Sequence, residues 1–204
     1  MVEEKPHPFV GSVNLALKAL FVGLLLLGVV ASDWPQFHGK AMAVRALTFP
    51  LAALLVPALW WIRGRPRPYP HVFDIMIVLP FVIDSGGNAL NLYNTMEVFD
   101  RFAHWLNWTI LVTAFGVAVS ALPISRLNVF ALAVGFGATT HICWEVIEYG
   151  LMQLGSSGLQ LTYADTIDDL VLSLLGTICG AAATITLFWG IPLVPEPLLH
   201  EPGP

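Results

Sequence analysis

Charged residues are scarce in this chain. Only 11% of its 204 residues are Asp, Glu, Lys or Arg, whereas 56% are hydrophobic, and the mean hydropathy is +0.74. Soluble domains carry about 25% charged residues, because they need polar side chains to cover their surface. This scarcity excludes an ordinary water-soluble domain and predicts a membrane protein.

Basic residues and cysteines are also few. The nine Lys and Arg residues are outnumbered by 14 Asp and Glu residues, so the chain lacks the basic surface that nucleic acid requires, and we exclude a nucleic-acid partner. The two cysteines, Cys143 and Cys179, form no C-x-x-C or metal-type spacing. We interpret both as buried, unpaired small residues in apolar segments, since a bridge would require two helices to align them.

What the chain has instead is a series of long apolar runs, each about the length that crosses 30 Å of hydrocarbon as a helix. The fold class we expect is all-α, a polytopic integral membrane helical bundle of about six transmembrane helices. It would form one domain over residues 1–204, with a short polar N-terminal segment at 1–11 and a proline-rich C-terminal tail at 195–204. The expected spans are 12–31, 46–62, 72–83, 105–122, 129–154 and one that follows 163–170 and ends near 194.

Two of these spans are irregular. The second contains Pro50 and Pro57, which predict a kink. The third is short and ends in Asp84-Ser-Gly-Gly-Asn88, so residues 72–93 are either one tilted helix or a helix broken at membrane depth. The first run also has a weak alternative as a cleavable signal peptide, disfavoured because its leader is acidic.

Lys and Arg residues are distributed unequally between the two sides. Five lie on the side of the termini, three of them in the short loop 63–71, against three on the other side, so the positive-inside rule places both termini in the cytoplasm. The opposite, outer side receives most of the acidic residues. The predicted location is the plasma (inner) membrane, with the lipid bilayer as the first partner.

The fifth span carries ionisable residues where lipid would be the expected surroundings. His141, Glu145 and Glu148 are spaced four and three residues apart, so they share one face of a helix. Each such group costs roughly 2.5–3.5 kcal/mol at the bilayer centre on insertion scales, which makes the stripe a candidate functional site.

Two further pairs repeat this spacing. Asp100 and His104 lie four apart at the start of the fourth span, where the carboxylate can hold the imidazole. Asp165 and Asp169 lie four apart at the start of the sixth, and their face continues through the small residues Gly176 and Gly180, which favour close contact with another helix, expected to be the fifth.

If the fourth, fifth and sixth spans meet, these residues line one cavity. Simpler interpretations exist for each. Asp165 and Asp169 can be first-turn carboxylates favoured by the helix dipole. Asp100 can form an interfacial salt bridge with Arg101, and His141 can hydrogen-bond across a helix pair. Glu145 and Glu148 are hardest to explain structurally, because the segment is apolar on both sides.

The combined pattern resembles a known family. Asp100-x-x-x-His104, Trp144-Glu-x-x-Glu148-Tyr149 and Tyr163-x-Asp-Thr-x-x-Asp169-Leu, followed by Gly176, resemble the YjdF family of bacterial inner-membrane proteins over residues 70–185. More distantly, the pattern is similar to VanZ-like membrane proteins. The resemblance implies a multi-spanning fold and marks the acidic and histidine positions, His141 excepted, without implying a reaction.

Three functions remain open from the sequence. The first is an enzyme that uses a divalent metal ion and acts on a lipid or lipid-linked substrate near the outer face. Its candidate catalytic residues are Asp100, His104, Glu145 and Glu148, and its candidate metal ligands are His104, Glu145, Glu148, Asp165 and Asp169. The alternatives are an ion- or proton-coupled transporter, favoured by a broken third span, and a non-catalytic accessory protein.

Overall fold

The computed structural model describes residues 8–159 and 161–191, and within these ranges every regular element is a helix. The helices are α1 (Pro8–Val30), α2 (Met42–Thr48), α3 (Pro50–Ile62), α4 (His71–Ala89), α5 (Leu92–Thr95), α6 (Glu97–Ser120), α7 (Arg126–Gln153), the 3-10 turn η1 (Ser157–Leu159) and α8 (Tyr163–Thr186). Six helical stretches are long and apolar enough to cross a membrane, which confirms the expected fold class.

The second span is built from two helices. α2 and α3 follow one another along 42–62, and the helix is interrupted at Phe49, directly before Pro50. Proline at the first position of α3 needs no amide hydrogen, so the chain restarts there at little cost. The predicted irregularity in this span is therefore present.

The third span decides between the two alternatives left open for residues 72–93: α4 is one helix from His71 to Ala89 rather than a helix broken after residue 83. α4 continues as a helix through Asp84-Ser-Gly-Gly-Asn88, where the Asn88 side chain donates to the Asp84 carbonyl (3.0 Å). Gly87 serves packing, because a Cβ there would collide with the rings of Phe99 and Tyr93. The chain reverses only after α4, at Asn91, whose φ of 61° is left-handed.

Other boundaries shift outward. α6 begins at Glu97 rather than near residue 105, and α1 begins at Pro8, inside the segment predicted to be a polar start. α8 ends at Thr186, and residues 187–191 contain turns and a bend but no helix, so the prediction that the sixth span continues as a helix is wrong over these residues. The remainder of the predicted extension to Val194 and the tail at 195–204 lie outside the described residues. That the whole chain forms one domain stays a prediction.

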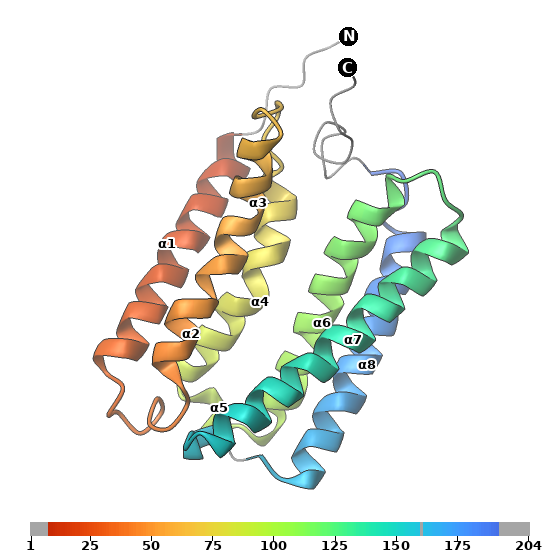
Figure 1. Ribbon diagram of the computed structural model, residues 1–204. Helices are drawn as coiled ribbons and strands as arrows, with labels where there is room; N and C mark the ends of the chain where they lie inside the picture. Colours follow the sequence, from red (N-terminus) through yellow and green to blue (C-terminus); the bar gives the residue numbers. More distant parts are fainter. Residues whose placement is uncertain (1–7, 160, 192–204) are drawn as a thin grey trace.

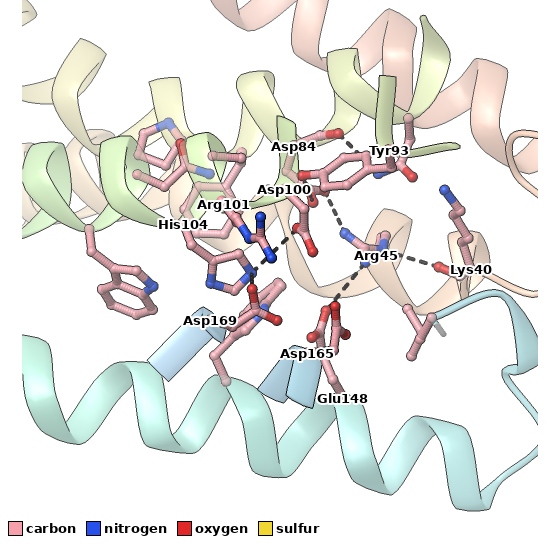
Figure 2. Close-up of a pocket in the computed structure, with 18 of the residues that line it drawn as sticks. Lys40, Arg45, Asp84, Tyr93, Asp100, Arg101, His104, Glu148, Asp165 and Asp169 are labelled. Atoms are coloured by element: carbon pink, nitrogen blue, oxygen red, sulfur yellow. Dashed lines mark hydrogen bonds and ion pairs between the residues drawn. The ribbon is translucent and has the colours of Figure 1, made fainter. Parts of the chain in front are cut away.

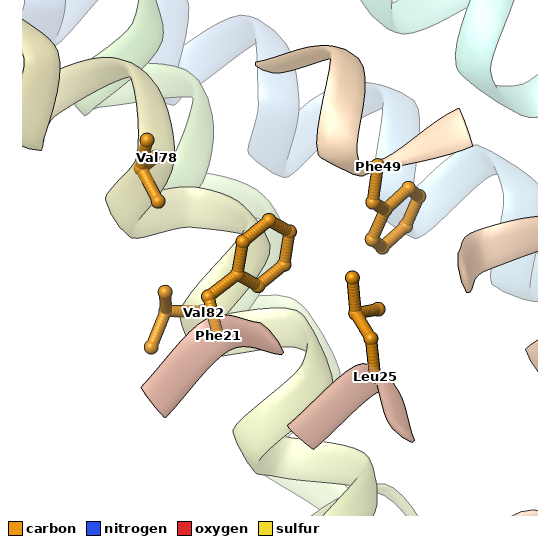
Figure 3. Packing of buried hydrophobic residues seen from close by; sticks show 5 residues of the cluster. All are labelled: Phe21, Leu25, Phe49, Val78 and Val82. Atoms are coloured by element: carbon orange, nitrogen blue, oxygen red, sulfur yellow. The ribbon is translucent and has the colours of Figure 1, made fainter. Parts of the chain in front are cut away.

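The helices pack as two halves that α4 and α6 join (Figure 1). In the first half, α1 packs against α2 and α4, and α3 packs against α4, around a core of Phe21, Leu25, Phe49, Val78 and Val82 (Figure 3). In the second half, α6, α7 and α8 all contact one another around Val112, Ala133 and Ala181. Cys143 and Cys179 are unpaired, as predicted, but the prediction that they are buried is wrong, because both are exposed.

Small residues position α8, although not against the helix that we expected. A Cβ on Gly176 would meet the carbonyl oxygen of Trp105, and one on Gly180 would meet that of Thr109, so both glycines face α6 rather than α7. The fifth span uses its own glycine, Gly137, to approach Thr177 of α8. Backbone contact at glycine therefore holds α6 and α8 closer than larger side chains would allow.

Six passes bring α1's first residue and α8's last to the same end of the bundle (Figure 1). At the opposite end lie the connection between α1 and α2, helix α5, and the connection between α7 and α8. The polar starts of α6 and α8 also lie at that end, which sets the position of the site.

Candidate functional site

A cavity of about 770 Å³ lies between the two halves, at the end of the bundle away from the start of α1 (Figure 2). Its lining combines seven carboxylates with three cations and several aromatic rings. The acidic residues are Asp84, Glu97, Asp100, Glu148, Asp165, Asp168 and Asp169, and the basic ones are Lys40, Arg45 and Arg101.

Three side chains converge in this cavity. His104 Nε2 lies 3.6 Å from Asp100 Oδ1, on the same helix, and 3.6 Å from Asp169 Oδ1 on α8. One potential ligand atom from each residue lies within 4.8 Å of the other two, and among the described residues this is the one such group of three. The close α6–α8 packing at Gly176 allows Asp169 to reach the α6 pair.

The other nitrogen of His104 is held by Ser173. His104 Nδ1 lies 3.0 Å from Ser173 Oγ, a buried hydroxyl one turn beyond Asp169 on α8. At 3.6 Å neither carboxylate hydrogen-bonds to Nε2, since such bonds are 2.7–3.2 Å long. If Nδ1–H donates to Ser173, the Nε2 lone pair faces two carboxylate oxygens, an arrangement that repels unless a cation lies between them.

A buried arginine lies on the other wall. Arg45 Nη1 donates to Asp84 Oδ2 (2.5 Å), Nε donates to the Lys40 carbonyl (3.1 Å), and Nη2 lies 3.7 Å from Glu148 Oε1. Its guanidinium also lies over the rings of Phe49 and Trp144, which favours a cation there. Because Glu148 belongs to α7, this ion pair links the two halves.

Lys40 and Tyr93 complete the mouth of the cavity. Lys40 Nζ donates to Asn94 Oδ1 (3.3 Å) and lies over the Tyr93 ring, whose hydroxyl donates to Asp84 Oδ1 (3.2 Å). Burial, with the nearby Arg45 cation, lowers the pKa of Lys40 below its ordinary value. Burial, with the Asp84 carboxylate, raises the pKa of Tyr93, so its hydroxyl stays a donor at neutral pH.

The residues nominated from sequence occupy different places. Asp100, His104, Asp165, Asp169 and Glu148 all line the cavity. Glu145 does not: it is buried beside it, and its Oε2 has no hydrogen-bond partner among the described residues. His141 is also buried, edge-on to the Trp108 ring at 5.8 Å, with Nδ1 unpartnered within the same part of the chain.

The expected salt bridge between Asp100 and Arg101 is not formed. Arg101 Nη2 instead pairs with Asp168 Oδ2 across to α8 (2.6 Å), on the exposed side of both helices. Consecutive residues on a helix point about 100° apart, so Asp100 points towards His104 while Arg101, at the exposed edge of the cavity, points towards Asp168. The carboxylate of Asp168 is therefore paired with a cation from α6.

Sequence reasoning missed Arg45, Asp84, Lys40, Tyr93 and Ser173 as members of the site. Arg45 was assigned to the polar link before the second span, because the apolar run begins after it. A signal was available for Ser173, which is four residues beyond Asp169 on the same face. Asp84 was read as part of a break, which obscured its position on a helix face.

The fold and the polar cavity define a class, the polytopic α-helical membrane protein with ionisable residues inside the bundle. The chain belongs to the family described as "Predicted membrane protein (DUF2238)", whose model matches residues 16–189. No curated protein and no solved structure matches it. The membrane family is thus established, while the finer resemblance to the YjdF and VanZ-like proteins stays a prediction.

Proposed function

We propose that the protein is a membrane-embedded enzyme that binds a divalent metal ion at Asp100, His104 and Asp169 and acts on the headgroup of a lipid or lipid-linked substrate. One observation carries this proposal: the three side chains bring their ligand atoms together inside a cavity at one end of the membrane-spanning bundle.

The spacing of the three atoms suits a metal. Bonds of about 2.0–2.2 Å from zinc to nitrogen and oxygen ligands place tetrahedral ligands about 3.3–3.6 Å apart. The two distances from His104 Nε2 are both 3.6 Å. One imidazole with two carboxylates suits zinc or manganese, and three protein ligands leave a coordination position open for water or substrate.

The surrounding residues supply further chemistry. A bound divalent ion would polarise a phosphoryl or carbonyl oxygen and acidify a bound water. Glu148, oriented by Arg45, and Asp165 line the same cavity and are candidates to accept a proton from that water. Glu145, which lies behind this wall, is a candidate to act through Glu148, one turn further along α7.

Metal content tests the proposal directly. Wild type, Asp169→Asn and Asp168→Asn are purified in mild detergent, incubated with zinc or manganese, desalted and analysed for bound metal. We expect one equivalent in the wild type and in Asp168→Asn, whose carboxylate pairs with Arg101 instead, and loss in Asp169→Asn. A wild type without metal, or equal metal in all three proteins, would contradict the proposal.

The transporter alternative loses one of its two supports. The break at Asp84–Asn88 that favoured it is absent, because α4 is continuous there, whereas the intramembrane carboxylates and histidine suit either function. An accessory role would explain helix–helix bonds but not three ligand atoms converging in a cavity.

The distribution of Lys and Arg residues supports a membrane location and orientation for the protein. The bias of Lys and Arg supports an inner-membrane protein with cytoplasmic termini, which puts the cavity at the outer face.

A further inference from the structure

The cavity changes in polarity with depth. Along α6 the lining residues run from Glu97 and Asp100 through His104 to Trp108 and Leu111. At 1.5 Å per residue, these positions cover about 21 Å along the helix. Charge therefore lies at the end of the bundle, and apolar side chains lie towards its middle.

The neighbouring helices repeat the same gradient. On α4 the order from the end inward is Asp84 and then Phe81. The charged residue Arg45 of α2 is followed, one turn further inward, by Phe49. On α7 the charged residue Glu148 lies one turn outside Trp144. Four helices thus give the cavity one charged end and one apolar end.

The volume exceeds what a headgroup needs. Cavities of about 300–1,000 Å³ enclose whole drug-sized ligands, and this one measures about 770 Å³. A metal ion with a bound phosphate-type headgroup would occupy the charged end, where Asp100, His104 and Asp169 lie. Water alone is a poor occupant for the remaining end, because the rings and Leu111 offer it few hydrogen bonds.

We infer that the cavity binds an amphiphile with a zwitterionic headgroup, holding the head among the charged residues and the first part of its apolar chain against Phe81, Trp108, Leu111 and Trp144. The inference rests on the proposed function, since it names the substrate class of the same site. A zwitterion fits because the lining carries seven carboxylates and three cations, so an anionic head would add to an existing negative excess. Its ammonium group would face that excess, while its phosphate would face the metal ion that Asp100, His104 and Asp169 would hold.

Photocrosslinking tests where the apolar chain of the amphiphile lies. The probe is dodecylphosphocholine with a diazirine in mid-chain, added to the protein in nanodiscs, with crosslinked residues mapped by mass spectrometry. We expect crosslinks at Trp108 and Trp144 in the cavity as well as at Leu174, which is exposed on α8 and reports ordinary contact with the bilayer. Excess soluble phosphocholine should reduce the crosslinks at Trp108 and Trp144 and leave the crosslink at Leu174 unchanged.

A larger side chain at the apolar end of the cavity should displace the alkyl chain of the probe. Leu111→Trp is expected to abolish crosslinking at Trp108 while Leu174 still reacts, and Leu106→Trp, on the same helix but outside the cavity lining, should leave the pattern intact. Leu111→Asn, which keeps the same number of side-chain heavy atoms and replaces two methyl groups with an amide, provides a second variant should the tryptophan disturb folding. It should lower crosslinking at Trp108 as well.

The outcomes separate this inference from the proposed function. Crosslinks confined to outward-facing residues such as Leu174, or unaltered crosslinks in both Leu111 variants, would overturn the amphiphile site even if the protein binds metal. Conversely, cavity crosslinks in a protein that binds no metal would support the amphiphile site and contradict the metal-dependent enzyme.

Discussion

Ser173 determines which nitrogen of His104 faces the two carboxylates. Its hydroxyl lies 3.0 Å from Nδ1, and it is buried, so water cannot substitute for it easily. A partner of this kind fixes the tautomer and orientation of a ligating histidine, and its removal typically lowers metal affinity by 10- to 100-fold.

We therefore expect Ser173→Ala to weaken zinc binding by about 10- to 100-fold without unfolding the protein. The measurement is a competition titration against a chromophoric chelator. Ser120→Ala is the control, because Ser120 donates only to the Val117 carbonyl at the other end of α6. Unchanged affinity in Ser173→Ala would show that the hydroxyl does not position the imidazole.

A buried carboxylate outside the cavity, that of Asp74, contributes to the stability of the fold. Asp74 has no exposed surface, and its Oδ2 accepts from Lys18 (2.6 Å), Asn14 (2.8 Å) and Tyr69 (2.6 Å). Burial, with the Asp74 hydrogen bond, raises the pKa of Tyr69, so this phenol stays protonated and keeps donating.

Lys18→Met should therefore be strongly destabilising, because it leaves the Asp74 carboxylate buried without its cation. Removal of one partner from a buried pair costs about 3–5 kcal/mol. We expect a fall in melting temperature of roughly 10 °C, measured in detergent. Arg101→Met removes one member of an exposed pair and should change the melting temperature little. Equal shifts in the two variants would argue that Asp74 is rehydrated.

At the scale of the elements, the contact between α6 and α8 determines the positions of the site residues relative to one another. Asp100 and His104 come from α6, whereas Asp169 and Ser173 come from α8, so their distances depend on how closely these helices approach. Gly176 sets that approach, because any side chain there would meet the Trp105 carbonyl.

Gly176→Ala should separate α6 and α8 locally and weaken both folding and metal binding. Overpacking typically costs about 1–3 kcal/mol, which corresponds to several degrees in melting temperature. Gly135→Ala on α7 is the matched control: a Cβ there meets nothing within 4 Å, and alanine is the better helix former. A stable Gly176→Ala protein with full metal content would show that the helices can adjust without moving the ligands.

For the molecule as a whole, the six spans place α1's start and α8's end on one side and the cavity on the other (Figure 1). The five Lys and Arg residues on the side of the termini favour a cytoplasmic location for that side. The cavity would then take its substrate from the outer leaflet.

Thiol labelling measures this orientation. In a background with Cys143 and Cys179 replaced by serine, Met96→Cys lies at the cavity end and Leu122→Cys lies in the connection at the opposite end; both native side chains are exposed. A membrane-impermeant maleimide should label Met96→Cys in intact cells and Leu122→Cys only after permeabilisation. The reverse pattern would place the cavity at the cytoplasmic face.

Much of the site was accessible from the sequence because helical geometry is local. Residues four apart share a face in any helix, so the sequence predicts that the pairs Asp100–His104 and Asp165–Asp169 point together, and all four residues line the cavity. Apolar length alone likewise predicted the spans. Arg45 and Asp84 were missed because an apolar run does not reveal a helix that continues through polar and glycine residues, as α4 does at Gly86 and Gly87.

What the sequence by itself determined is the membrane class, the number of spans and the helix faces that carry ionisable groups. Only the tertiary structure decided which faces meet. Gly176 and Gly180 suit contact with any helix, and they lie against α6 rather than α7 because the carbonyls of Trp105 and Thr109 fill the space a Cβ would take. That choice brings Asp169 to His104, since ligand distances depend on backbone separation between helices, which no spacing along a single helix encodes.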